Sequence, residues 1–186
     1  HQVMKCYADM WGPDADLIFF MDSDCFFVED VTPNDYLNDG NPVLCIESFG
    51  RLKSSPWKAP TDAALGINAK WETMRRHGAI HWRGMFNEFR SRVDKATGKQ
   101  FDDYVLSCKP TYPWFFSEFV ALGNFVITSH WNSQYHFIDV GKQPYPKNKM
   151  LDVWSHAPID QAQPERYRGL FPPTMTVLQI LNKVLA

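Results

Sequence analysis

The chain has 186 residues, of which 45% are hydrophobic and 15% aromatic, and its formal net charge is −2 at pH 7. This length and composition predict one domain, residues 1–186, with enough apolar side chains to bury a sizeable core. The charge gives no reason to expect nucleic acid or an anionic membrane as a partner. No apolar run approaches the roughly 20 residues of a membrane-spanning helix.

Periodicity and turn residues predict the elements of the first half of the chain. They are a helix at 2–10, a buried strand at 17–21, a short strand at 26–28, a turn-rich segment at 32–42, a strand at 43–47, a loop at 48–60 and a helix at 61–76. Thr61 and Asp62 are expected to cap the last of these helices. The opening HQVMKCYADMW lacks a secretory signal and resembles the inside of a helix, so we expect the numbering to begin within a longer chain.

The second half continues this alternation of helices and strands. The predicted elements are an extended segment at 80–86, helices at 87–96, 101–107 and 118–127, strands at 135–140 and 151–154, and a C-terminal helix that begins at Thr174. Ser117 is expected to cap the helix that starts with Glu118, whose carboxylate the helix dipole favours. The whole pattern predicts an α/β fold.

The four cysteines are widely spaced and form no Cys-x-x-Cys pair. This spacing argues against zinc. It favours reduced and mostly buried thiols, so we expect a cytoplasmic protein.

The triplet Asp22-Ser23-Asp24 ends the buried strand, and a second apolar run follows it. Carboxylates at the end of a buried strand are costly unless something pairs with them. Side chains two apart on an extended chain point the same way, so Asp22 and Asp24 can reach one divalent cation. The alternative is a turn in which the aspartates bond nearby backbone N–H groups.

A buried strand that ends in Asp-x-Asp and leads into another apolar strand resembles the signature of GT-A glycosyltransferases. Gln2 and Lys5 lie just before it, and Ser117-Glu118-Phe119 with Gly123-Asn124 lies far after it. That wider arrangement is similar to an uncharacterised family of bacterial and viral glycosyltransferase-like proteins.

The resemblance implies a mixed, mostly parallel sheet flanked by helices. It also implies that Asp22, Ser23 and Asp24 hold Mn²⁺ or Mg²⁺ against the diphosphate of a nucleotide-sugar donor, whose sugar moves to a glycan or another hydroxyl acceptor. Only 21 residues precede Asp22. The βαβ unit that binds the base in GT-A domains is therefore expected to be missing or shortened.

Gln2 and Lys5 lie three residues apart and share one face of their helix. By resemblance, this face points toward the nucleotide; the alternative is a solvated helix surface. Glu118 is the candidate catalytic base or acceptor-binding carboxylate, and the alternative is that it only caps its helix. Trp114 is a candidate platform for a sugar ring.

The polar and aromatic segment of His81, Trp82 and Arg83 is a candidate for contacts with the donor sugar or the acceptor, unless it forms an exposed strand edge. His156 is the candidate third metal ligand, since GT-A enzymes often add a late histidine and imidazole suits Mn²⁺. His130 competes with it, and either histidine could be structural.

Two other functions stay open. An Asp-x-Asp after a buried strand also suits phosphoryl-transfer hydrolases, in which the first Asp is a nucleophile and the second an acid. These sites need a later Lys and further carboxylates near the metal, and the chain offers no convincing matching set. The chain could also be a non-catalytic fragment that keeps the GT-A-like fold without binding nucleotide.

Overall fold

The computed structural model describes residues 2–22, 25–27, 29–75, 78–109, 111, 116–144, 146 and 149–152. The described helices are α1 (Gln2–Lys5), α2 (Lys58–Leu65), α3 (Met85–Thr97), α4 (Phe101–Ser107) and α5 (Glu118–Ile127), with short 3-10 turns η1 (Ala8–Met10), η2 (Pro33–Asp35), η3 (Phe49–Arg51) and η4 (His130–Gln134). The described strands are β1 (Leu17–Phe20), β2 (Cys25–Phe27), β3 (Leu37–Asn38), β4 (Asn41–Ser48), β5 (Trp71–Glu72), β6 (Ala79–Trp82), β7 (His136–Asp139) and β8 (Met150–Asp152).

The strand pairings are mainly antiparallel. Strand β1 pairs with β6, β2 with β8, and β4 with both β3 and β5, all antiparallel, whereas β4 and β7 run parallel. The prediction of an α/β protein is confirmed at this level, but the mostly parallel sheet is wrong for the described strands. An apolar run fits a strand of either direction, and only the connections between strands fix the direction.

Strand β1 separates two environments. Ile18 and Phe20 face the helices, and the Phe20 ring packs edge-on against Phe86 and Phe119, with centroids 5.7 Å and 6.2 Å away. Leu17 and Phe19 face the other way and line an apolar cavity of about 640 Å³. The face of β1 that carries Leu17 and Phe19 is only partly buried, so the prediction of a strand buried on both faces is wrong. Phe20 is the one buried residue of β1.

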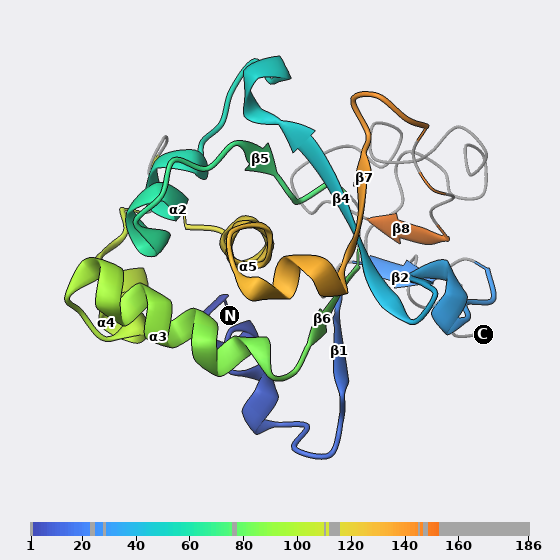
Figure 1. Ribbon diagram of the computed structural model, residues 1–186, viewed down its shortest axis with the longest axis horizontal. Helices are drawn as coiled ribbons and strands as arrows, with labels where there is room; N and C mark the ends of the chain where they lie inside the picture. Colours follow the sequence, from blue (N-terminus) through green and yellow to red (C-terminus); the bar gives the residue numbers. More distant parts are fainter. Residues whose placement is uncertain are drawn as a thin grey trace, which may run out of the picture.

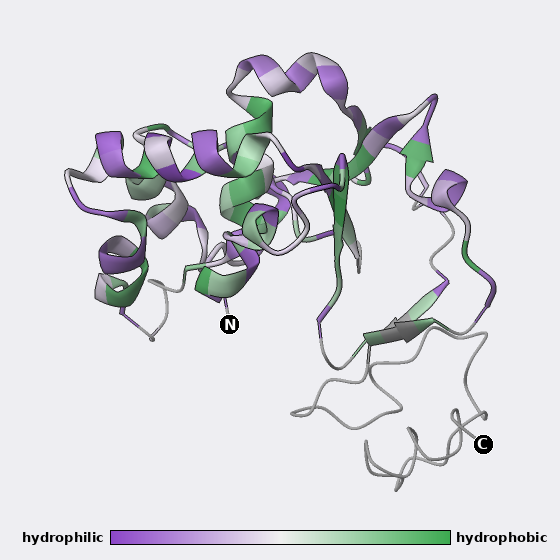
Figure 2. Cartoon of the chain, turned by 90° about the horizontal axis from the view of Figure 1, so that it is seen from below, coloured by the Kyte–Doolittle hydropathy of each residue, from purple (hydrophilic) through white to green (hydrophobic). Residues whose placement is uncertain are grey.

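Helix α5 lies at the centre of the described chain. Nine of its ten residues are buried, and Figure 1 shows it end-on between α2, α3 and α4 on one side and the strands on the other. Figure 2 shows hydrophobic residues on the inner helix and strands. Gly123 lets the segment after β5 pack closely against α5, because a Cβ at this position would collide with the Thr73 side chain.

The predicted boundaries hold for several elements and fail for two helices. The helices at 87–96 and 101–107, the Ser117 cap and the strands at 43–47 and 135–140 are confirmed within a few residues. The extended segment predicted at 80–86 is confirmed only in its first part, because β6 ends at Trp82 and α3 begins at Met85. The helix predicted at 61–76 is wrong: α2 begins at Lys58 and ends at Gly66, whose φ of +63° is left-handed. The helix predicted at 2–10 breaks into α1 and η1.

The thiols match the sequence prediction. Three of the four cysteines are buried, namely Cys6, Cys25 and Cys45, and Cys108 is partly exposed. Among the described residues, no helix is long and apolar enough to cross a membrane. The predicted C-terminal helix lies outside the described residues.

Candidate functional site

Three charged side chains from distant parts of the chain meet at the C-terminal end of β1. The Lys5 ammonium group, on α1, donates to a carboxylate oxygen of Asp22, directly after β1, and to Glu118 Oε1 at 2.8 Å, on the first turn of α5. The Lys5 and Glu118 side chains are only 10% and 5% exposed, whereas that of Asp22 is 43% exposed. The structure thus brings together three of the residues that the sequence selected.

Helix α5 fixes the position of Glu118. Ser117 Oγ accepts the N–H of Val120, which confirms the predicted cap and places Glu118 at the first helical position. The ring of Phe119 lies 4.4 Å from the Lys5 nitrogen and supplies a cation–π contact. Gln2, also on α1, donates to the Phe116 carbonyl oxygen at 2.7 Å. Gln2 and Lys5 therefore both contact the start of α5 rather than lying on a solvated helix surface.

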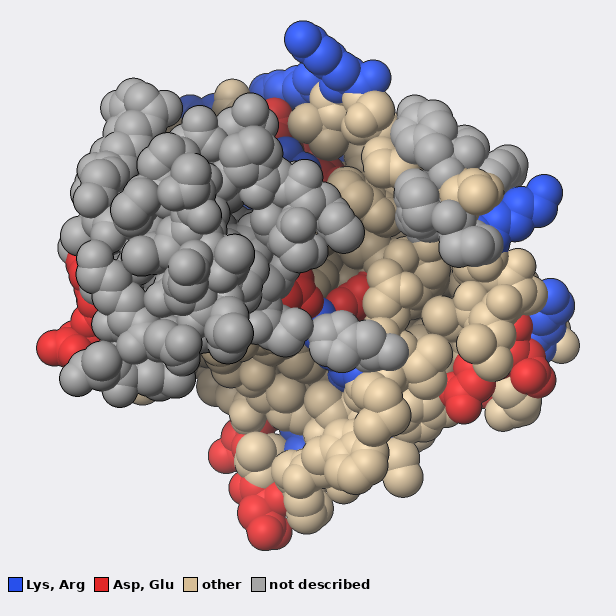
Figure 3. All heavy atoms as spheres, turned by 180° about the vertical axis from the view of Figure 1, so that it is seen from behind, with Lys and Arg blue, Asp and Glu red and all other residues tan. Residues whose placement is uncertain are grey.

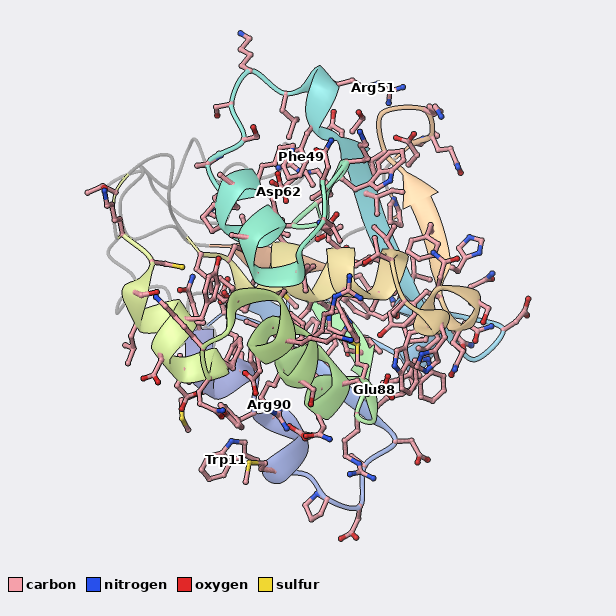
Figure 4. All side chains as sticks on the ribbon, turned by 60° about the vertical axis from the view of Figure 1, so that its left-hand side comes forward. Trp11, Phe49, Arg51, Asp62, Glu88 and Arg90 are labelled. Atoms are coloured by element: carbon pink, nitrogen blue, oxygen red, sulfur yellow. The ribbon has the colours of Figure 1, made fainter. Side chains whose placement is uncertain are left out.

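An ion pair between α3 and η1 holds the N-terminal segment in place. Arg90, on α3, donates to both carboxylate oxygens of Asp9 at 2.6 Å and 2.8 Å and to the Cys6 carbonyl oxygen at 2.6 Å. Its guanidinium carbon also lies 4.4 Å from the centre of the Tyr7 ring. Figure 4 shows Arg90 directed from α3 toward this segment, while Trp11 points outward at the edge.

The charges at the site are set by their neighbours. Burial lowers the pKa of Lys5, but its hydrogen bonds and charge interactions with Asp22 and Glu118 outweigh burial and raise that pKa above its ordinary value. Lys5 therefore stays protonated at neutral pH. Burial, reinforced by the charge of Glu118, raises the pKa of the adjacent Cys6 thiol, which stays neutral.

Asp22 is the one described residue of the predicted metal site. Its carboxylate is the type of ligand that Mg²⁺ and Mn²⁺ prefer, and it is partly open to solvent. Among the described residues, no group of three His, Cys, Asp or Glu side chains could hold a metal ion. The other predicted residues of the metal site, Ser23, Asp24 and His156, lie outside the described residues. Of the predicted ligands that the structure describes, Asp22 offers a carboxylate oxygen, which suits Mn²⁺ or Mg²⁺.

Trp82 and Arg83 are not brought to this site. In the β1–β6 register Trp82 faces Leu17, at the opposite end of β1 from Asp22, roughly 15 Å away by strand rise. The Trp82 indole N–H donates to the Gln134 carbonyl at 3.1 Å, and Arg83 Nε donates to the Ala15 carbonyl at 2.8 Å. These hydrogen bonds join β6 and the turn after it to the backbone at Gln134 and at Ala15. Trp114 lies outside the described residues.

His81, the remaining residue of that predicted segment, is buried in the core and is not exposed to a ligand. His81 is fully buried between β1 and α3, and its Nδ1 lies 3.0 Å from the Tyr135 hydroxyl. Its Nε2 has no hydrogen-bond partner in the described part of the chain. Burial lowers the pKa of His81 to about 3, so it is a neutral core residue at physiological pH.

One face of the described chain carries charged side chains of both signs. Figure 3 shows acidic and basic atoms close together near the middle of this face, at the border of the residues that are not described.

Comparison of the chain with protein-family models, curated proteins and solved structures finds no match. The arrangement of the residues themselves is therefore the basis for a functional proposal.

Proposed function

We propose that the chain is a metal-dependent glycosyltransferase that moves a sugar from a nucleotide-diphosphate-sugar donor to a hydroxyl acceptor. One observation carries the proposal. Gln2, Lys5, Asp22 and Glu118 were selected from a resemblance to GT-A glycosyltransferases, and all four contact one another or the start of α5. A coincidental pattern in the sequence gives no reason for this convergence.

In this proposal the end of β1 binds the donor. Asp22 holds Mn²⁺ or Mg²⁺ together with Asp24, and with His156 as a predicted third ligand. The divalent cation stabilises the charge that develops on the leaving diphosphate. Lys5 adds a fixed positive charge beside Asp22, and Ser23, between the two aspartates in sequence, stays a predicted binding residue. Trp114 stays a predicted platform for a sugar ring. Trp82 and Arg83 have no role in the proposal, because they lie at the other end of β1.

A second candidate is a metal-dependent phosphoryl-transfer hydrolase. Such an enzyme is expected to have a lysine and a further carboxylate near the first Asp, and Lys5 and Glu118 both lie beside Asp22, although Lys5 precedes Asp22 in the chain rather than following it. In that reaction Asp22 is the nucleophile and Lys5 neutralises the phosphoryl oxygens. Phosphatase activity without any turnover of nucleotide sugars supports this candidate instead.

Isothermal titration calorimetry with UDP, GDP, ADP and CDP, each with and without Mn²⁺, tests the first proposal. We expect one nucleotide to bind only when Mn²⁺ is present, and the matching nucleotide sugar to be consumed in a transfer or slow hydrolysis assay. Release of phosphate from p-nitrophenyl phosphate is measured alongside, because it distinguishes the hydrolase.

The matched variants are Asp22→Asn, which keeps the size of the side chain, and Asp103→Asn, which removes an exposed carboxylate on α4. The first is expected to abolish Mn²⁺-dependent binding of the nucleotide, and the second to leave it unchanged. Metal-dependent binding that survives in Asp22→Asn, or that is absent from the unsubstituted protein, contradicts the proposal.

A further inference from the structure

The two ion pairs of Lys5 differ in their exposure to water. The carboxylate of Glu118 is 5% exposed and that of Asp22 is 43% exposed, although both accept from the same ammonium group. An ion pair that is open to water contributes little to stability. Removing one partner of a buried pair is costly, because the remaining charge has lost both water and its counter-ion.

Lys5 is therefore held firmly on one side and weakly on the other. Glu118 and the Phe119 ring, both on α5, contact the ammonium group from the buried side. Asp22 contacts it at the open side, at the end of β1. A ligand that reaches the site from solvent can compete for the Asp22 side of Lys5 without exposing Glu118.

We propose that Lys5 is a diphosphate-binding residue that keeps its bond to Glu118 and exchanges Asp22 for a phosphate oxygen when the donor binds. This inference rests on the proposed function. It makes Glu118 a positioning residue that holds Lys5, in place of the catalytic base predicted from the sequence. A carboxylate that is buried and bound to an ammonium group is poorly placed to accept a proton from an acceptor hydroxyl.

The chemistry of the three residues favours this exchange. Lys5 carries three N–H donors and forms charge-assisted bonds with phosphate oxygens. The exchange also frees the Asp22 carboxylate for the divalent cation that accompanies a diphosphate. Lys5, Asp22 and Glu118 together carry a net charge of −1, which disfavours a bare anion. Diphosphate and cation are therefore expected to bind together.

Calorimetry with two titrants tests the exchange without relying on turnover: Mn²⁺ alone, and magnesium pyrophosphate, which contains the diphosphate without a base or sugar. The variants are Glu118→Gln and the double variant Lys5→Met with Glu118→Gln. The double variant removes both members of the buried pair, so neither is left as an isolated charge. Lys95→Met, at an exposed position on α3, is the matched control, and thermal unfolding shows that each variant is folded.

In Glu118→Gln, Asp22 becomes the sole carboxylate partner of Lys5. The Lys5 ammonium group then competes more strongly with Mn²⁺ for the Asp22 carboxylate. We expect the Mn²⁺ affinity to fall roughly 2- to 5-fold. In the double variant the competing ammonium is gone, so Mn²⁺ affinity returns to or exceeds that of the unsubstituted protein. Affinity for magnesium pyrophosphate falls at least about tenfold, because a charged hydrogen bond is lost.

The change in local charge, from −1 to 0 in Glu118→Gln and back to −1 in the double variant, also predicts this course of the Mn²⁺ affinity. The loss of pyrophosphate affinity is therefore the result that a purely structural Lys5 would not produce. Equal pyrophosphate affinities in the double variant and the control would overturn the inference but leave the proposed function standing. The same is true if Mn²⁺ affinity falls in both variants. If the unsubstituted protein binds neither titrant, the proposed function fails and the inference fails with it. Should the double variant not fold, the fall in Mn²⁺ affinity of Glu118→Gln still decides, and an unchanged or higher affinity refutes the exchange.

Discussion

Replacing Lys5 by Met should destabilise the protein by about 3–5 kcal/mol, because Glu118 would remain buried without a counter-ion. Substituting Glu118→Gln in the same protein should recover much of this loss. The coupling free energy between Lys5 and Glu118 should therefore reach about 2–3 kcal/mol. The coupling between Lys5 and Asp22 should stay below about 1 kcal/mol, since the Asp22 side chain is 43% exposed.

Two double-mutant cycles measure these couplings, one with Lys5→Met and Glu118→Gln, the other with Lys5→Met and Asp22→Asn. Urea unfolding at pH 7, followed by circular dichroism, gives the free energy of unfolding of each variant, provided that the m-values agree. Raising the salt concentration should weaken the Asp22 coupling more than the Glu118 coupling. An Asp22 coupling equal to or larger than the Glu118 coupling would refute the reasoning from exposure.

Three further predictions concern the surroundings of the site. Gly123→Ala should lower the free energy of unfolding by roughly 1–3 kcal/mol through overpacking against Thr73, and an unchanged melting temperature would contradict this. Burial lowers the pKa of His81 to about 3, so the unfolded state binds more protons between about pH 3 and 6.5, and stability rises with pH across that range. The free energy of unfolding should rise by up to about 1.4 kcal/mol per pH unit, and this rise should be smaller in His81→Phe when urea unfolding is repeated from pH 4 to 7. An equal rise in both proteins would contradict the assignment of this pH dependence to His81. Arg90→Met removes the ion pair with Asp9, so amide hydrogen exchange at residues 2–10 should accelerate at least about tenfold while α5 stays protected, and equal rates would show that the pair does not hold this segment.

Local signals predicted much of the secondary structure. The Ser117 cap, the helix predicted at 87–96 and the apolar run of β1 each depend on residues close together in sequence, and each is present. The helix predicted at 61–76 failed because apolar spacing continued through Gly66, where the backbone is left-handed. A single glycine inside a periodic pattern is a weak signal, and here it ends the helix.

The site was only partly predictable, because its contacts join distant segments. Lys5 and Glu118 are 113 residues apart, and no local pattern pairs them; the resemblance to a family selected them, and the fold brings them together. The contact between Arg90 and Asp9 spans 81 residues and gave no sequence signal at all. The prediction of a mostly parallel sheet failed for the same reason, since the direction of a strand depends on the path of the chain between strands rather than on the strand itself.

The assembly of the site from α1, the end of β1 and the start of α5 has a practical consequence. A ligand that contacts Lys5 and Asp22, with Lys5 held by Glu118, binds the folded chain and has no comparable site in the unfolded one. Such a ligand raises the apparent stability by about 2.7 kcal/mol at a hundred times its dissociation constant. A thermal-shift screen of nucleotide sugars with Mn²⁺ can therefore identify the donor before any acceptor is known, with Asp22→Asn as the protein in which the shift should vanish.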